Sequence, residues 1–320
     1  MIHSVHILRG LCAWMVVVHH FSFSYFQGMQ NPLPSALQEF TFILGIGVDV
    51  FFVISGFVMS LVLEKNSLSA ISAFSFLKKR LLRIIPGWWF YLTLFILTTS
   101  FLSKMPYPIE WEWKTALQSI ILIPHQNLNG SGYYPILYVG WSLMYELFFY
   151  GLIFALLAVP IKHIGAIVGL TLFVITIIFP ESSLLGHSNF FFMEFLVGFI
   201  FRKSPVFVGA FILWSGFSIF QLYGIFEAAR FALATSIFTI FLSYNITENS
   251  LIYRIMKSSG DYSYSLYLSH LIIIGLVHIA FPPSNNMLMN TLALITVILL
   301  TYYISKLSFK WVEQKFHQTN

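Results

Sequence analysis

Charged residues are scarce in this chain. Asp, Glu, Lys and Arg make up only 9% of its 320 residues, while 58% are hydrophobic and 18% are aromatic. Because soluble domains carry about 25% charged residues, this composition excludes an ordinary soluble protein and predicts one that crosses a membrane several times. A single cysteine, Cys12, excludes an internal disulfide.

Several motifs of known enzyme classes are absent as well. The chain has no Gly-rich phosphate loop and no Gly-x-Ser-x-Gly nucleophile turn. Only His19 and His20 form a histidine cluster, whereas membrane di-iron sites need several, so we expect no metal. Cys12 lies off the His20 face of its helix, which argues against a thioester there. The pI of 9.2 calls for no nucleic acid partner, because lysine and arginine mark the inner loops of membrane proteins.

Long hydrophobic runs are what the chain has instead of charge. Runs of roughly 17–22 residues match the thickness of a bilayer. They predict an all-α, polytopic membrane helical bundle of about ten transmembrane helices, formed by one domain over residues 1–320. We expect the first run to be retained, since no small-residue cleavage site precedes Gln27. The runs lie near 6–26, 42–63, 84–103, 140–159, 164–180, 206–222, 228–245, 262–281 and 287–307, with a shorter one near 189–201.

Lysine and arginine give the orientation of these spans. With the N-terminus inside and ten spans, thirteen of these residues fall in inner segments. Three fall in outer segments: Lys104, Lys114 and Arg230. We therefore predict that the N- and C-termini are both cytoplasmic.

The first run carries Arg9 and His20, eleven residues apart. At 100° per residue they share one helix face, with the imidazole about 16 Å above the guanidinium. Ionisable groups at membrane depth are costly, so we expect them to serve a site. His19 points about 80° away from this face, which favours a packing role.

His20, Asp49 and Glu146 occupy one predicted depth. Counted along their helices, all three lie about 9–10 Å below the outer boundary. A histidine and two carboxylates at one level can share a proton or orient one another. The alternative is a polar network that only holds helices together.

Arg80 and Arg83 lie one turn apart at the predicted cytosolic start of the third helix. Two such guanidiniums form a fork for phosphates, although they could also simply mark the topology. Ser142 and Glu146 share a face of the fourth helix. The ninth run opens with hydroxyl side chains and reaches His270, which fits either helix packing or a polar tunnel.

Two further segments have a dense pattern. Residues 45–56 hold glycines that permit close helix packing, with Asp49 and Ser55 as the polar side chains. The predicted outer loop 104–139 is rich in aromatic residues, including Tyr133 and Tyr134. It is either an interfacial aromatic belt or a lid that binds sugar.

Five motifs in order resemble the acyltransferase 3 family of membrane O-acyltransferases, and the likeness covers nearly the whole chain. Val312-Glu313 also resembles the family's closing Glu, without the proline often found two residues later. The five motifs are Leu8-Arg9-Gly10-Leu-x-Ala13 with His20 eleven residues after the arginine, Gly47-Val-Asp-Val-Phe-Phe-Val-Ile-Ser-Gly-Phe57, Arg80-x-x-Arg83-Ile-x-Pro86, Trp141-Ser-Leu-x-x-Glu146-x-x-Phe-Tyr150 and Ser263-Tyr264-Ser-Leu-Tyr-Leu-x-His270.

The resemblance implies transfer of an acyl group, usually acetyl from acetyl-CoA, to a hydroxyl of a glycan such as a surface polysaccharide, an O-antigen or an exopolysaccharide precursor. It implies a bacterial inner membrane protein whose acceptor is a glycan or lipid-linked glycan. Some members carry a fused extracytoplasmic domain that completes transfer; we expect a stand-alone member here, so a separate extracytoplasmic partner is a further possibility.

The resemblance also implies roles for individual residues. His20 would be the catalytic histidine, as general base or transient acyl carrier, with Asp49 or Glu146 orienting it. The other implied sites are the donor-binding residues Arg9, Arg80, Arg83, Tyr264 and His270, and the acceptor-binding residues Trp141, Ser142, Tyr133 and Tyr134.

Three other functions remain open from the sequence. A transporter or flippase of a glycan intermediate could use the same polar residues as a proton relay, although no matching pair of broken helices indicates inverted repeats. The same chemistry could acylate a lipid or a protein. A purely structural membrane protein would explain neither the Arg9–His20 phasing nor the pattern of residues 47–57.

Overall fold

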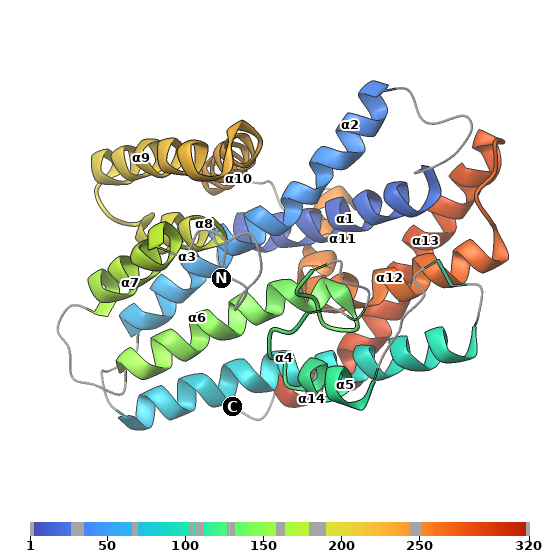
Figure 1. The fold of residues 1–320 in the computed structure, drawn as a ribbon, viewed down its shortest axis with the longest axis horizontal. Coiled ribbons are helices and arrows are strands. Elements are labelled where there is room, and N and C mark those ends of the chain that lie inside the picture. Colours follow the sequence, from blue (N-terminus) through green and yellow to red (C-terminus); the bar gives the residue numbers. More distant parts are fainter. Residues whose placement is uncertain are drawn as a thin grey trace.

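The structure, a computed structural model, describes residues 3–26, 35–65, 70–102, 105–106, 112–126, 128, 132–157, 164–178, 190–243 and 251–317. Within these ranges all regular structure is helical, which confirms the predicted all-α fold (Figure 1). In chain order the elements are α1 (His3–Phe26), α2 (Ser35–Ile43), the 3-10 turn η1 (Leu44–Ile46), α3 (Gly47–Lys65), α4 (Ala70–Phe101), α5 (Trp113–Ile120), η2 (Tyr138–Gly140), α6 (Trp141–Leu157), α7 (Ile164–Ile178), α8 (Phe191–Ile200), α9 (Pro205–Tyr223), α10 (Ile225–Ser243), α11 (Leu251–Asp261), α12 (Ser263–Ala280), α13 (Met287–Ser308), the π-helical turn η3 (Phe309–Glu313) and α14 (Gln314–His317).

Eight helical stretches among the described residues are long and apolar enough to cross a bilayer. The remaining two predicted spans correspond to α7 and α8, which have 15 and 10 residues. Residues 191–199 of α8 are all buried, so this short helix lies inside the bundle. The chain is a polytopic helical membrane protein.

Two predicted boundaries were wrong. The second apolar run begins at Ser35 rather than at 42, and η1 separates α2 from α3. The third helix begins at Ala70 rather than at 84, so residues 70–83 are helical and Arg80 and Arg83 lie well inside α4. Charged residues do not stop this helix, because Lys78 and Lys79 are exposed on its outer side.

Glycines bring α3 and α8 into backbone contact, as the glycine pattern of residues 45–56 predicted. A Cβ atom on Gly56 would lie 1.9 Å from the carbonyl oxygen of Phe195. A Cβ on Gly198 would lie 1.8 Å from the carbonyl oxygen of Val53. No larger residue fits at either position without separating the two helices.

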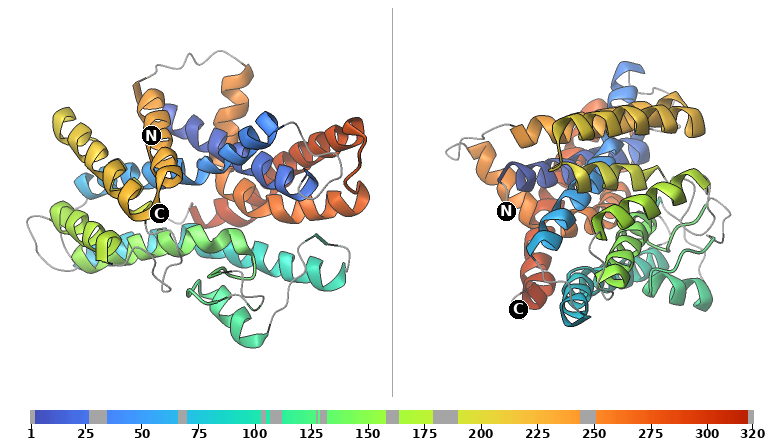
Figure 2. Two further views of the ribbon diagram at one scale, coloured as in Figure 1. Left: turned by 45° about the horizontal axis from the view of Figure 1, so that its top comes forward. Right: turned by 90° about the vertical axis from the view of Figure 1, so that its left-hand side faces the viewer.

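Helices α1 and α12 run parallel through the centre of the molecule. At one end His6 Nε2 lies 2.9 Å from Asp261 Oδ1, just before α12 begins. At the other end the Tyr25 hydroxyl donates to the carbonyl of Phe281, at 2.8 Å. Figure 2 shows α9 and α10 on one flank of the bundle and α4 on the opposite flank. The functional residues gather around α1 and α12.

Candidate active site

A cavity opens between α1, α3, α4, α6 and α12. It encloses about 940 Å³ of open space, its mouth included. Its polar lining comes from five helices that are far apart in the sequence, and this lining consists of Arg9, Ser55, Arg80, Arg83, Ser142, Glu146, Tyr150, Ser263, Tyr264 and Tyr267.

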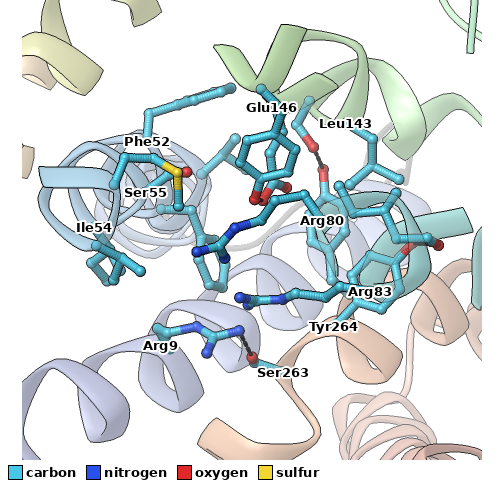
Figure 3. A pocket seen from close by; sticks show the side chains of 18 residues that line it. Arg9, Phe52, Ile54, Ser55, Arg80, Arg83, Leu143, Glu146, Ser263 and Tyr264 are labelled. Carbon is cyan, nitrogen blue, oxygen red and sulfur yellow. Dashed lines mark hydrogen bonds between the residues drawn. The ribbon is translucent and has the colours of Figure 1, made fainter. Parts of the chain in front are cut away.

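Three guanidinium groups face this cavity. Figure 3 shows the heads of Arg9, Arg80 and Arg83 in a row within it. Arg9 Nη2 donates to Ser263 Oγ at 3.0 Å, and the Arg80 guanidinium lies 5.6 Å from the centre of the Tyr150 ring. Because Glu146 is the one carboxylate of the lining, the cavity has an excess of positive charge that suits a phosphate-bearing ligand.

Glu146 lies in this basic cavity. It accepts a hydrogen bond from Tyr150, which is four residues further along the same face of α6. Glu146 and His20 were predicted to lie at the same depth, but Glu146 is bonded to Tyr150 and not to His20. The nearby arginines offer the carboxylate a stronger electrostatic attraction than a neutral imidazole does.

The lining of the cavity changes along its length. Ser142 and Tyr150 are eight residues apart on α6, about 12 Å along the helix axis. The arginines lie toward the Tyr150 end, whereas the Ser142 end carries Phe51 and Leu143. At this end the Tyr267 hydroxyl lies 2.8 Å from the Val139 carbonyl oxygen and 2.9 Å from Ser142 Oγ. A ligand with a phosphate end and a slim uncharged arm matches this gradient.

A pair of histidines lies beyond Tyr267. The ring centres of Tyr267 and His270 are 5.9 Å apart, and His270 Nε2 is 3.2 Å from His20 Nδ1. His20 Nδ1 is also 3.0 Å from the carbonyl oxygen of Val16. Since a carbonyl can only accept, we assign the proton of His20 to Nδ1; this one N–H is then shared between the Val16 carbonyl oxygen and Nε2 of His270, and Nε2 of His20 is left unprotonated.

This pair corrects the predicted place of His270. The hydroxyl-rich start of α12 led us to expect His270 along the donor path, but its side chain is fully buried and contacts His20 instead. Predicted depth did not indicate this pair, because His20 lies 14 residues and His270 only 8 residues above the inner end of its run, a difference of about 9 Å.

Asp49 does not lie at His20 either. It is fully buried, and its Oδ2 accepts from Nη2 of Arg230 at 2.8 Å. Arg230 lies 5.6 Å from the centre of the Phe190 ring, and the buried Glu194 completes this cluster. The rise per residue predicts the depth of a residue in the membrane. It does not predict which neighbouring helix the side chain will face. The sequence analysis missed Arg230 as a partner, although a buried carboxylate requires a nearby cation.

The predicted acceptor-binding residues are dispersed. Ser142 lines the cavity, and so does Tyr264, which was predicted to bind the donor and which donates to the carbonyl of Ile84 at 2.6 Å. Trp141 packs in an aromatic cluster, with its ring centre 5.1 Å from that of Phe191. Tyr133 and Tyr134 are half-buried in the segment before η2 and are absent from the lining of this cavity.

Other residues of the predicted aromatic loop have a structural role. Trp88 Nε1 of α4 donates to the carbonyl of Ser119 in α5 at 2.9 Å, and Ser119 Oγ accepts from the backbone of Ile136. Trp111, Asn127, Asn129 and Ser131, which were part of the predicted sugar-binding lid, lie outside the described residues.

Comparisons with known proteins identify the family of the chain. A 26% identical relative, the exopolysaccharide production protein ExoZ of Rhizobium meliloti (strain 1021), aligns over 248 residues, 72% of this chain and 77% of the relative. No solved structure matches the chain. The family model of the acyltransferase 3 family, described as an acyltransferase domain, matches residues 2–306. The chain therefore belongs to the acyltransferase 3 family and is a multi-pass membrane acyltransferase.

Proposed function

We propose that this protein transfers an acetyl group from cytosolic acetyl-CoA to a hydroxyl of an exopolysaccharide precursor. The observation that carries the proposal is the closeness of the three-arginine cavity to the His20–His270 pair: Tyr267 lines the cavity, and its ring centre lies 5.9 Å from that of His270, which contacts His20. The name of the relative ExoZ, an exopolysaccharide production protein, supports a glycan as the acceptor.

Donor binding follows from the charge of the cavity. The phosphates of coenzyme A would pair with Arg9, Arg80 and Arg83, whose fixed donor forks match phosphate oxygens. The uncharged pantetheine arm would extend past Glu146 toward Ser142 and Tyr267. The thioester carbonyl would then arrive at the end of the cavity nearest to His20.

The histidine pair supplies the proton chemistry. Nε2 of His20 removes the proton from the acceptor hydroxyl as its oxygen attacks the thioester carbon. The tetrahedral intermediate collapses, the C–S bond breaks, and the imidazolium returns the proton to the departing thiolate. His270 accepts from Nδ1–H throughout, so it orients His20 and stabilises its charged form. An acyl-imidazole on the same Nε2 is the alternative in which His20 carries the acyl group.

Thiol release from acetyl-CoA tests this proposal. Wild type and His20→Ala are compared in nanodiscs, with and without a panel of bacterial oligosaccharides and their lipid-linked forms. We expect acceptor-stimulated release that falls by about 10²–10⁴-fold in His20→Ala, the usual worth of a general base. Unchanged melting of the variant excludes misfolding. Movement of the glycan across proteoliposomes without thiol release would instead indicate a transporter.

A further inference from the structure

A second cavity lies at the other end of α1, between α1 and α2. It encloses about 570 Å³ of open space, its mouth included, and shares no lining residue with the arginine cavity. The lining residues that matter here are His19, Ser22, Phe23, Gln38, Thr41 and Phe42. His19 and Ser22 lie ten and thirteen residues beyond Arg9, about 15–20 Å along the helix.

The break between α2 and α3 forms this cavity. Figure 1 shows α2 leaving the direction of α3 and rising away from α1. At the break, the His19 ring packs directly against Gly45. A Cβ atom on Gly45 would lie only 3.2 Å from Cε1 of His19. Nδ1 of His19 donates to the carbonyl of Thr41 at 3.1 Å, which leaves its Nε2 as an acceptor.

His19 connects this cavity to the reaction centre. The rings of His19 and His20 meet edge to face, with their centres 5.1 Å apart. The His20–His270 pair therefore stands between two cavities, one basic and one with mixed aromatic and polar lining. An acyl transfer needs two substrates that meet at one base, and the basic cavity accounts for only the donor.

The lining of the second cavity suits a sugar. Phe23 and Phe42 offer ring faces, and they are 53% and 55% exposed. Ser22, Thr41 and Gln38 provide hydroxyl and amide groups beside them. An aromatic wall with a few directed polar groups is the usual design of a small-molecule site. Among the described residues of this lining no side chain is charged, which disfavours a second phosphate-bearing ligand.

We propose that the α1–α2 cavity binds the sugar unit of the acceptor and presents its hydroxyl to Nε2 of His20. This inference rests on the proposed function and names the acceptor site of that same reaction. The donor and acceptor then enter from opposite ends of α1, and His19 lines the acceptor cavity directly beside His20.

Photolabelling tests the site without requiring turnover. The probe is n-octyl β-D-glucoside with a diazirine next to the sugar. The control probe is the same octyl diazirine without the sugar. In nanodiscs we expect the glucoside to label peptides covering residues 22–26 and 38–42 more strongly than the sugar-free probe does. Equal labelling by the two probes would show a lipid-chain groove and overturn the proposal, as would labelling confined to other helices.

Two substitutions with matched controls sharpen the test. Gly45→Ala should displace His19, and Thr41→Val should remove a hydroxyl while keeping the carbonyl that holds His19. We expect each to weaken sugar-dependent labelling by about fivefold, the usual effect of one lost hydrogen bond. The controls are Gly209→Ala, where nothing lies within 4 Å of the new Cβ, and Thr291→Val, an exposed helical threonine bonded like Thr41 to its own helix.

Unchanged labelling in both Gly45→Ala and Thr41→Val would overturn the acceptor site. Thiol release by the wild type is measured on the same preparation. If the release depends on His20 while labelling is insensitive to both variants, the transferase survives and only this acceptor site is wrong. If neither signal is found in folded protein, both proposals fail together.

Discussion

At the scale of single residues, His270 is the most informative position after His20. Its Nε2 accepts from Nδ1 of His20, and it does not line the donor cavity. We expect His270→Ala to lower kcat by about 10–100-fold, as the loss of an orienting partner does, with little change in the KM for acetyl-CoA. His270→Gln should recover part of the rate, because an amide oxygen can also accept. A raised KM with an unchanged kcat would place His270 in donor binding instead.

Arg83 carries the corresponding prediction for the donor. Its guanidinium faces the cavity with Arg9 and Arg80, so under the proposed function Arg83→Ala would remove a charge-assisted bond to a donor phosphate. We expect the KM for acetyl-CoA to rise by about tenfold or more. Lys79→Ala is the control, because Lys79 lies on the same helix but is exposed. Equal effects of the two substitutions on KM would show that Arg83 does not bind the donor and only marks the cytosolic side of the membrane.

At the scale of secondary-structure elements, the contact of α3 with α8 determines the position of the cavity wall. Gly198→Ala would put a Cβ 1.8 Å from the Val53 carbonyl oxygen and push the two helices apart. We expect a clear fall in the melting temperature in detergent, since small residues at such contacts permit the close packing that holds membrane helices together. Gly151→Ala is the control, because nothing lies within 4 Å of its new Cβ. Similar melting of both variants would contradict the tight contact.

The sequence predicted the helices better than it predicted which residues of distant helices lie next to each other. Trp141 and Ser263 begin helices as expected, and the glycines of residues 47–56 pack as expected, because periodicity and residue size act locally. Arg9, Arg80 and Arg83 were identified as one group through the resemblance to a family. Asp49 was misplaced because its partner Arg230 is 181 residues away, and no local pattern encodes which way two distant helices face.

At the scale of the whole molecule, the orientation of the bundle decides which cavity meets acetyl-CoA. The contacts of His6 with Asp261 and of Tyr25 with Phe281 place the ends of α1 and α12 on common sides, as the distribution of lysine and arginine requires. The arginine cavity includes Arg9 near the start of α1, and the α1–α2 cavity includes Ser22 and Phe23 near its end. Under the proposed function, this arrangement would keep a cytosolic donor and an outer acceptor apart until they meet at His20.

Cysteine labelling in intact cells checks this orientation. The native Cys12 is fully buried, so its background reaction with a maleimide should be low. We expect Asn286→Cys to react with a membrane-impermeant maleimide from outside, and Lys203→Cys to react only after the inner membrane is opened. The reverse pattern would place the arginines on the outside, away from acetyl-CoA, and would contradict the proposed donor. Reaction of both sites from outside would mean that an even number of spans separates Lys203 from Asn286, and the ten-helix topology would be wrong.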